Sequence, residues 1–184
     1  MRVITGTARG RKLRTLAGDE VRPTSDNVKE AMFSIIQFDI EGRAVLDLFS
    51  GSGQLGIEAL SRGARICTFV DSSRHSLEVT RENVATCRFD DRANIVLSDA
   101  ATFLQRAQSK GQRFDIALLD PPYESNLLDK LLPEMAQVMN TGGVILCEAP
   151  ERKVLPETAG EFVKRRTYRH GRIALTLYRH SSID

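Results

Sequence analysis

Cysteine is scarce in this sequence, and its spacing excludes two common ways of stabilising a small protein. The 184 residues contain three cysteines, an odd number without a CxxC pair. Such spacing indicates neither a disulfide framework nor a zinc site. We therefore expect free thiols, no bound metal and a cytoplasmic location. The cysteines are Cys67, Cys87 and Cys147.

Long hydrophobic runs are also absent. No apolar stretch approaches the roughly 18 residues of a membrane helix, and residues 1–6 lack the apolar core of a signal peptide. The length suits one well-buried domain and is short for two. The three histidines have no partner spacing, so surface or loop roles are expected for them. We expect a monomeric protein without a membrane partner.

The charge is distributed unevenly along the chain. Residues 1–22 carry six basic and two acidic side chains, residues 162–180 carry six basic and no acidic ones, and the middle is acidic. Basic ends around an acidic middle suit an enzyme that holds a polyanion such as RNA, although solvated faces give the same pattern. The candidate RNA-binding residues are Arg9, Arg11, Lys12, Arg22, Lys164, Arg165 and Arg166.

Apolar runs and helical periodicities alternate along most of the chain. Buried strands are predicted at residues 44–49, 65–70, 94–98, 114–119 and 144–147, and helices at 54–62, 73–85, 100–109 and 126–139. In the last helix we expect a kink or a break at Pro133. This alternation predicts βαβ units, and hence an α/β fold with a mostly parallel sheet.

Two further pieces flank this core. Residues 24–37 predict an amphipathic helix capped by Ser25, and residues 2–16 a short basic hairpin before it. Residues 162–168 and 172–178 predict a closing hairpin, which places one antiparallel strand in the sheet. We expect residues 1–41 to form an N-terminal extension and residues 42–184 the catalytic domain, packed as one globular unit.

A glycine loop follows the first predicted strand. Residues 51–56 read G-x-G-x-x-G, and Asp71 follows Gly51 by 20 residues, as in dinucleotide-binding proteins. A plain strand-to-helix turn would also need glycines. However, Asp47 lies just ahead of the loop, and aspartates end three predicted strands, so the edge repels phosphates. We therefore predict S-adenosylmethionine, which carries an ammonium and a sulfonium group. The candidate cofactor-binding residues are Asp47, Gly51, Ser52, Gly53, Asp71 and Asp99.

The motif Asp120-Pro121-Pro122-Tyr123 follows the fourth predicted strand and provides the candidate catalytic residues. Two prolines can simply end a strand. Placed next to the glycine loop, however, the carboxylate and the Pro121 carbonyl could accept both hydrogens of an exocyclic amine, while Tyr123 stacks on the base. Carbon methylation of a pyrimidine would need a cysteine nucleophile, and this loop has none. The motif therefore favours methyl transfer to an amino nitrogen.

Four blocks of sequence together resemble a known family. They are G-T-A-R-G-R-K-L, R-P-T-S-D-N-V-K-E-A-M-F, V-L-D-L-F-S-G-S-G-Q-L-G-I-E-A-L-S-R-G-A and L-D-P-P-Y. In this order they are similar to the RsmD-type bacterial 16S rRNA (guanine-N2)-methyltransferase family. The resemblance implies a Rossmann-like, seven-stranded methyltransferase fold and S-adenosylmethionine as the methyl donor. It also implies that the substrate is 16S ribosomal RNA or a small-subunit assembly particle.

The same resemblance assigns roles to individual residues. It implies that Gly51, Ser52, Gly53 and Asp71 contact the cofactor, Asp99 its adenine, and residues 120–123 the target base. The chain departs modestly from the family pattern, with Ser50 and Gln54 where smaller residues are usual and Asp71 where glutamate is common; each preserves the chemistry.

Two alternatives to a guanine-N2 methyltransferase stay open. The first is an adenine-N6 methyltransferase on DNA or RNA, because the same loop serves both amines. It is weakened by the lack of an insertion that could recognise DNA. The second is a catalytically idle RNA-binding assembly factor. An idle pocket would have no need of the acidic and glycine positions that this chain keeps.

Overall fold

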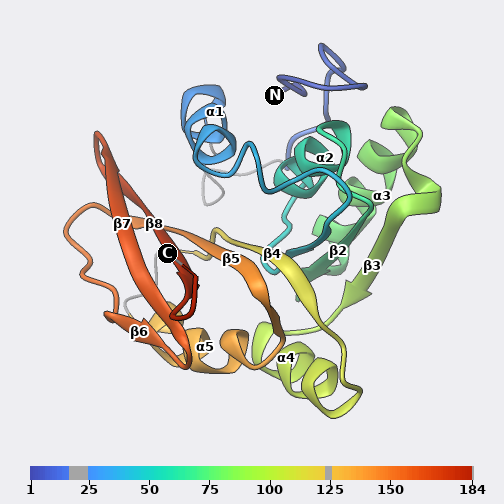
Figure 1. Ribbon diagram of the computed structural model, residues 1–184. Helices are drawn as coiled ribbons and strands as arrows, with labels where there is room; N and C mark the ends of the chain where they lie inside the picture. The colour runs from blue at the N-terminus through green and yellow to red at the C-terminus, as the bar shows by residue number, and fades with distance from the viewer. Residues whose placement is uncertain (17–24, 123–125, 184) are drawn as a thin grey trace.

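The computed structural model describes residues 1–16, 25–122 and 126–183 (Figure 1). A single mixed sheet crosses the molecule. Its strands are β1 (Ala44–Asp47), β2 (Ile66–Asp71), β3 (Ala93–Leu97), β4 (Phe114–Leu119), β5 (Met139–Pro150), β6 (Thr158–Ala159), β7 (Phe162–His170) and β8 (Ile173–His180). They lie in the order β3-β2-β1-β4-β5-β8-β7-β6. The first five in this order are parallel, and β8 is antiparallel to β5.

Helices cover both faces of the sheet. They are α1 (Asp26–Ile35), α2 (Gln54–Ser61), α3 (Arg74–Cys87), α4 (Ala100–Ser109) and α5 (Leu127–Ala136), with a short 3₁₀ turn, η1, at Asp90–Arg92. Side chains of α1, α2 and α3 form one buried cluster with the sheet, and those of α4 and α5 form another. Figure 1 shows α1–α3 above the sheet and α4 and α5 below it. Strands β1, β2, β4 and most of β5 are buried on both faces, which explains their continuous apolar runs.

The predicted fold class is confirmed. Strand β1 pairs with β2 on one side and with β4 on the other, so the chain order reverses between β1 and β4. Open α/β sheets bind ligands at such a switch point, outside the carboxyl ends of the strands. The glycine loop follows β1 and the Asp-Pro-Pro motif follows β4, so the two motifs are neighbours, as the sequence predicted.

The structure adds details that the sequence pattern did not give. The two-residue strand β6 raises the number of strands from the seven predicted to eight. Like β8, it runs antiparallel to the five parallel strands β1–β5. Two residues are too few to show any periodicity. The predicted break at Pro133 is not observed, because α5 runs through it and ends three residues later, at Ala136. Ser25 caps α1, as predicted, and accepts a hydrogen bond from the Val28 amide at 3.3 Å.

The N-terminal segment (residues 1–16) folds back on itself as a short hairpin, with one antiparallel bridge between Arg2 and Lys12 and three backbone hydrogen bonds, in which the amides of residues 3, 10 and 13 donate to the carbonyls of residues 11, 3 and 1. Its apolar side chains Val3, Ala8 and Leu13 are buried in the same cluster as α1 and α2. The carboxylate of Glu58 on α2 accepts hydrogen bonds from the amides of residues 4 and 5, at 2.8 and 3.0 Å. Tertiary contacts therefore hold this segment in addition to its hairpin pairing.

Candidate active site

A cavity of about 700 Å³ opens at the carboxyl ends of the parallel strands. Its walls come from loops that follow β1, β2, β3 and β4, together with β5, α5 and the N-terminal segment. The lining residues of the strand-end loops include Ser50, Gly51, Ser52, Asp71, Asp99, Asp120, Pro121 and Pro122. A cavity of this size is within the range of ordinary ligand sites. Most of the predicted catalytic and cofactor-binding residues therefore line one shared space.

The glycine loop has the conformation that its glycines permit. Gly53 begins α2 with a φ of +81°, and a Cβ there would lie 2.9 Å from the Thr80 side chain. Gly56 lies so close to β2 that a Cβ would meet the Phe69 ring at 2.2 Å. The first glycine therefore provides the turn, and the second lets the helix pack closely on the sheet. Gly53 is not among the lining residues of the cavity.

Asp47 supports the loop from beneath. It ends β1 with an exposed fraction of 1%, and its carboxylate accepts the Gly56 amide at 2.9 Å. Burial raises the pKa of Asp47 to about 7; the Gly56 hydrogen bond opposes this rise, and the charges of Asp120 and Asp71 add to it. Asp47 is not among the residues that line the cavity. This position lets it fix where α2 begins and couple electrostatically to the acidic edge.

Three aspartates stand where the sequence predicted, at the carboxyl ends of β2, β3 and β4. Asp71 accepts the amides of Gly51 and Ser73 at 2.9 and 2.8 Å, so it ties the glycine loop to the start of α3. Asp99 caps α4 by accepting the Thr102 amide at 2.9 Å, a bond that lowers the pKa of Asp99. Asp120 follows β4 directly and lines the cavity with both prolines. Tyr123 lies outside the described residues.

Sequence reasoning missed several polar residues of the cavity. Glu148 lies near the end of β5, lines the cavity and has an exposed fraction of 4%. The rule that selected the aspartates at strand ends could have found it. Ser50 and Gln54 also line the cavity, and the Oγ of Ser50 and the Oε1 of Gln54 are buried without a partner in the described part of the chain. Buried polar atoms of this kind suit a polar ligand.

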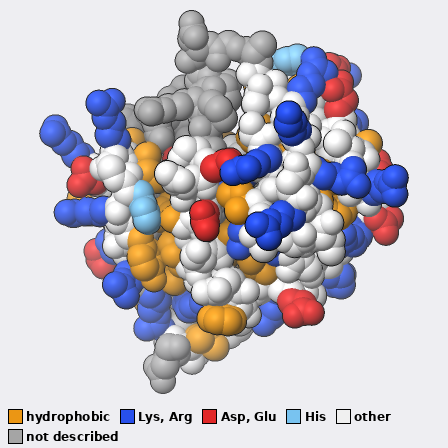
Figure 2. Space-filling view, turned by 90° about the horizontal axis from the view of Figure 1, so that it is seen from above, with side chains coloured by type: hydrophobic (Ala, Val, Ile, Leu, Met, Phe, Trp, Pro, Cys, Tyr) orange, Lys and Arg blue, Asp and Glu red, His pale blue; other side chains and the backbone are white. Residues whose placement is uncertain are grey.

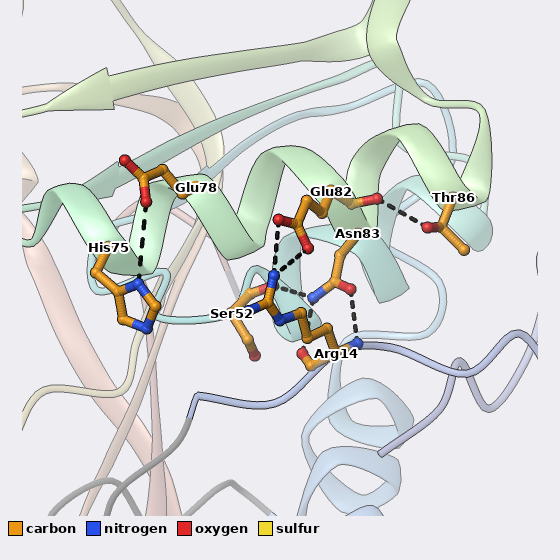
Figure 3. A network of polar contacts seen from close by, with 7 residues as sticks. All are labelled: Arg14, Ser52, His75, Glu78, Glu82, Asn83 and Thr86. Atoms are coloured by element: carbon orange, nitrogen blue, oxygen red, sulfur yellow. Dashed lines mark hydrogen bonds and ion pairs between the residues drawn. The ribbon is translucent and has the colours of Figure 1, made fainter.

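The N-terminal segment forms one wall of this cavity through Met1, Thr15 and Leu16. Asn83 of α3 holds that wall in place, as Figure 3 shows. Its side chain accepts the Arg14 amide at 2.7 Å and donates to the Arg14 carbonyl at 3.0 Å and to the Ser52 carbonyl at 2.8 Å. One buried amide therefore joins α3, the glycine loop and the N-terminal segment. No feature of the sequence indicated this connection.

The predicted RNA-binding residues lie on two separate elements, the N-terminal segment and β7. Figure 2 shows Lys and Arg side chains on both sides of the face it presents, with acidic side chains between them. Arg9, Arg11 and Lys12 are all exposed, and Arg11 donates to the Thr86 carbonyl at 2.8 Å. Arg22 lies outside the described residues.

The basic residues of β7 differ in their freedom to meet a ligand. Lys164 donates to the Leu155 carbonyl at 3.0 Å and pairs with Glu157. Arg165 donates to the carbonyls of residues 180 and 183 at the end of the chain. Arg166 is exposed and stacks over the Tyr168 ring at 4.9 Å. Arg166 is therefore the most available of the three.

Membrane-spanning helices and metal-binding clusters are both absent from the described residues. None of the helices within residues 1–16, 25–122 and 126–183 is long and apolar enough to cross a membrane. No group of three or more His, Cys, Asp or Glu side chains in those ranges could hold a metal ion. The three cysteines are free and buried, and burial raises the pKa of each thiol.

Comparison with known proteins relates this arrangement to a family. Residues 1–179 match the family described as "Conserved hypothetical protein 95". The chain is 38% identical to "Putative rRNA methyltransferase YlbH" of Bacillus subtilis, over 97% of this chain and 98% of that protein. It is 32% identical to "Ribosomal RNA small subunit methyltransferase D" of Escherichia coli, over 99% and 91%. The solved structure of "Putative methyltransferase yhhF from Escherichia coli" superposes with a TM-score of 0.85 at 34% identity, over 98% and 97%.

Proposed function

The chain belongs to the RsmD-like rRNA methyltransferase family, described as conserved hypothetical protein 95, and from this premise we propose that it methylates the exocyclic N2 of a guanine in 16S ribosomal RNA. The proposed methyl donor is S-adenosylmethionine. The proposed substrate is the RNA itself or a small-subunit assembly particle, because the Escherichia coli relative is named for the small subunit.

The observation that carries this proposal is the meeting of two motifs at one cavity. The glycine loop and Asp71 on one side and Asp120-Pro121-Pro122 on the other follow adjacent strands and line the same space. S-adenosylmethionine supplies an electrophilic methyl group on a positively charged sulfur. A rim of aspartates favours a ligand with positive groups, and its charge disfavours the phosphates of a dinucleotide. The geometry therefore suits this donor better than a nicotinamide cofactor.

The residues after β4 orient the accepting amine. In the proposed complex, the Asp120 carboxylate and the Pro121 carbonyl each accept one N–H of the target amino group. Both hydrogens are then engaged, and the nitrogen lone pair is drawn out of conjugation with the ring and directed at the methyl group. Two successive prolines restrict this backbone, so that little reorganisation is needed during transfer. Tyr123 is proposed to stack on the base, a contact worth about 1–3 kcal/mol.

Single-turnover methylation tests the proposal. The substrate is 16S ribosomal RNA from cells that lack the gene for this protein, and mass mapping identifies the methylated nucleoside. Asp120→Ala should lower the rate roughly 10²–10³-fold, with affinity for S-adenosylmethionine within a few-fold of wild type. Asp120→Asn keeps an acceptor and should retain part of the rate. Tyr123→Ala should weaken the productive complex, whereas Tyr123→Phe keeps the ring.

Asp115 offers a matched control on the same strand. It lies near the amino end of β4, away from the cavity, and its carboxylate accepts the Ala44 amide at 2.9 Å. Asp115→Asn keeps that acceptor and should methylate at the wild-type rate. A wild-type rate for Asp120→Ala would remove the motif from the mechanism. A methylated adenine in place of N2-methylguanine would instead favour the adenine-N6 alternative.

A further inference from the structure

Glu148 occupies a position in the cavity that the proposed reaction does not yet use. Leu119 of β4 pairs in register with Cys147 of β5, so the next residues of the two strands, Asp120 and Glu148, follow side by side. Neighbouring strands are about 4.8 Å apart. Both residues line the cavity, and Glu148 is almost fully buried. A second carboxylate therefore stands next to the one that is proposed to hold the amine.

The order of the strands indicates which ligand Glu148 faces. The proposed cofactor residues follow β1, β2 and β3, whereas β4 and then β5 lie on the other side of β1. Asp120 after β4 is thus between the cofactor residues and Glu148. Glu148 is therefore placed to contact the base that accepts the methyl group, and not the methyl donor. This assignment rests on the proposed function.

The chemistry of the two candidate bases differs at the atom next to the amine. Guanine carries an N1–H donor beside its N2 amino group, whereas adenine carries an N1 lone pair beside its N6 amino group. The acceptors of Asp120 and Pro121 can engage the amine of either base and cannot distinguish them. A carboxylate that faces N1 can, because it accepts from an N–H and repels a lone pair.

We propose that Glu148 is a specificity-determining residue that accepts a hydrogen bond from N1–H of the target guanine. An N–H of the base at this point gives the Glu148 carboxylate a donor, whereas a lone pair there is repelled by it. Sites built to bond an N–H reject analogues that lack it strongly, by up to about 10⁴–10⁵-fold.

The test uses a base that keeps the reacting amine and loses only the neighbouring donor and the 6-oxygen. In 2-aminopurine the 2-amino group is present and N1 carries a lone pair. The probe is 16S ribosomal RNA in which the methylated guanosine, once mapped, is replaced by 2-aminopurine through splinted ligation. Wild-type protein should methylate the guanine RNA at least about 100-fold faster than this probe.

Glu148→Gln separates the N1 contact from the loss of the 6-oxygen. The amide can accept from N1–H through its oxygen or donate to an N1 lone pair through its nitrogen. We expect the preference for guanine over 2-aminopurine to fall at least about tenfold in this variant, while affinity for S-adenosylmethionine stays within a few-fold. Glu151→Gln, an exposed glutamate just beyond β5, is the control and should keep the wild-type preference.

Each other outcome is decisive. If wild-type protein methylates the guanine RNA and the 2-aminopurine RNA at equal rates, the inference is overturned, and no variant is needed to show it. An unchanged preference in Glu148→Gln overturns it as well, and a large loss of cofactor affinity would assign Glu148 to the cofactor instead. If the wild-type protein methylates no guanine N2, the proposed function itself fails. Guanine methylation with an unchanged preference refutes the role of Glu148 alone.

Discussion

Replacement of Asp47 by asparagine should change how the stability of the protein depends on pH. Burial raises the pKa of this carboxyl to about 7, from an ordinary value of 3.8. Between these values the folded protein holds a proton that the unfolded chain releases. The stability linked to this proton is therefore fully present below about pH 4 and is lost as the pH rises through 7.

The magnitude follows from the two pKa values. Their difference corresponds to about 4 kcal/mol in the free energy of unfolding, of which about 3 kcal/mol is lost between pH 5 and pH 8. Asparagine at position 47 carries no titrating proton but keeps an oxygen that can accept the Gly56 amide. The difference in stability between Asp47→Asn and wild type should thus move by about 3 kcal/mol in favour of the variant over this range.

Urea unfolding at pH 5, 6, 7 and 8 measures this difference, and the comparison of two proteins cancels the contribution of titrating groups that do not interact with Asp47. Asp47→Ala is the control, since it removes the proton and also the acceptor for Gly56. Alanine should show the same trend with pH but be less stable than asparagine at every pH, by about 1–3 kcal/mol for a buried amide without a partner. A constant difference between Asp47→Asn and wild type across the pH range would refute the reasoning.

Three other predictions concern the walls of the site. Asn83→Ala breaks three hydrogen bonds and should lower the free energy of unfolding, measured by urea unfolding, by about 2–3 kcal/mol. It should also weaken binding of S-adenosylmethionine, measured by calorimetry. The control Glu82→Gln weakens only the exposed ion pair with Arg14 and should have a much smaller effect on both. Asp71→Asn should weaken cofactor binding at least about tenfold, and NAD should not bind; binding of NAD without S-adenosylmethionine would contradict the cofactor assignment. Neutralisation of exposed basic residues should lower RNA affinity and flatten its dependence on salt while cofactor affinity is kept, and equal loss of both would indicate a damaged fold. The residues to neutralise are Arg9, Lys12 and Arg166.

Much of the fold could be predicted because the signals are local. Strand β4 and helix α4 have the predicted bounds, since continuous apolar runs and helical spacing mark elements that pack against a buried sheet. Strand β5 is longer than predicted, at Met139–Pro150. At its start, residues 140–142 are exposed and have no apolar pattern; at its end, Glu148 and Pro150 interrupt the apolar run although Glu148 is buried.

The site was predictable where one rule applied and was missed where contacts are distant in sequence. Aspartates at the carboxyl ends of strands were found from position alone. Glu148 directly follows the predicted strand at 144–147 and obeys the same rule, but the rule was applied to aspartates alone. Asn83 contacts Arg14 across 69 residues, and a single polar residue in a helix gives no sign of such a partner. Charge counts likewise predicted basic ends but could not tell that Lys164 is held by Glu157.

The N-terminal segment also has a consequence for how the protein is made. Its hydrogen-bond partners on α2 and α3 lie roughly 50 to 70 residues later in the chain. During synthesis this segment leaves the ribosome before α2 and α3, and its docking cannot be complete until α3 has emerged. The wall that it forms is thus translated before its partners and settles after them. Until then one wall of the cavity is missing from the nascent chain. A newly made molecule should therefore become able to bind the methyl donor in one late step.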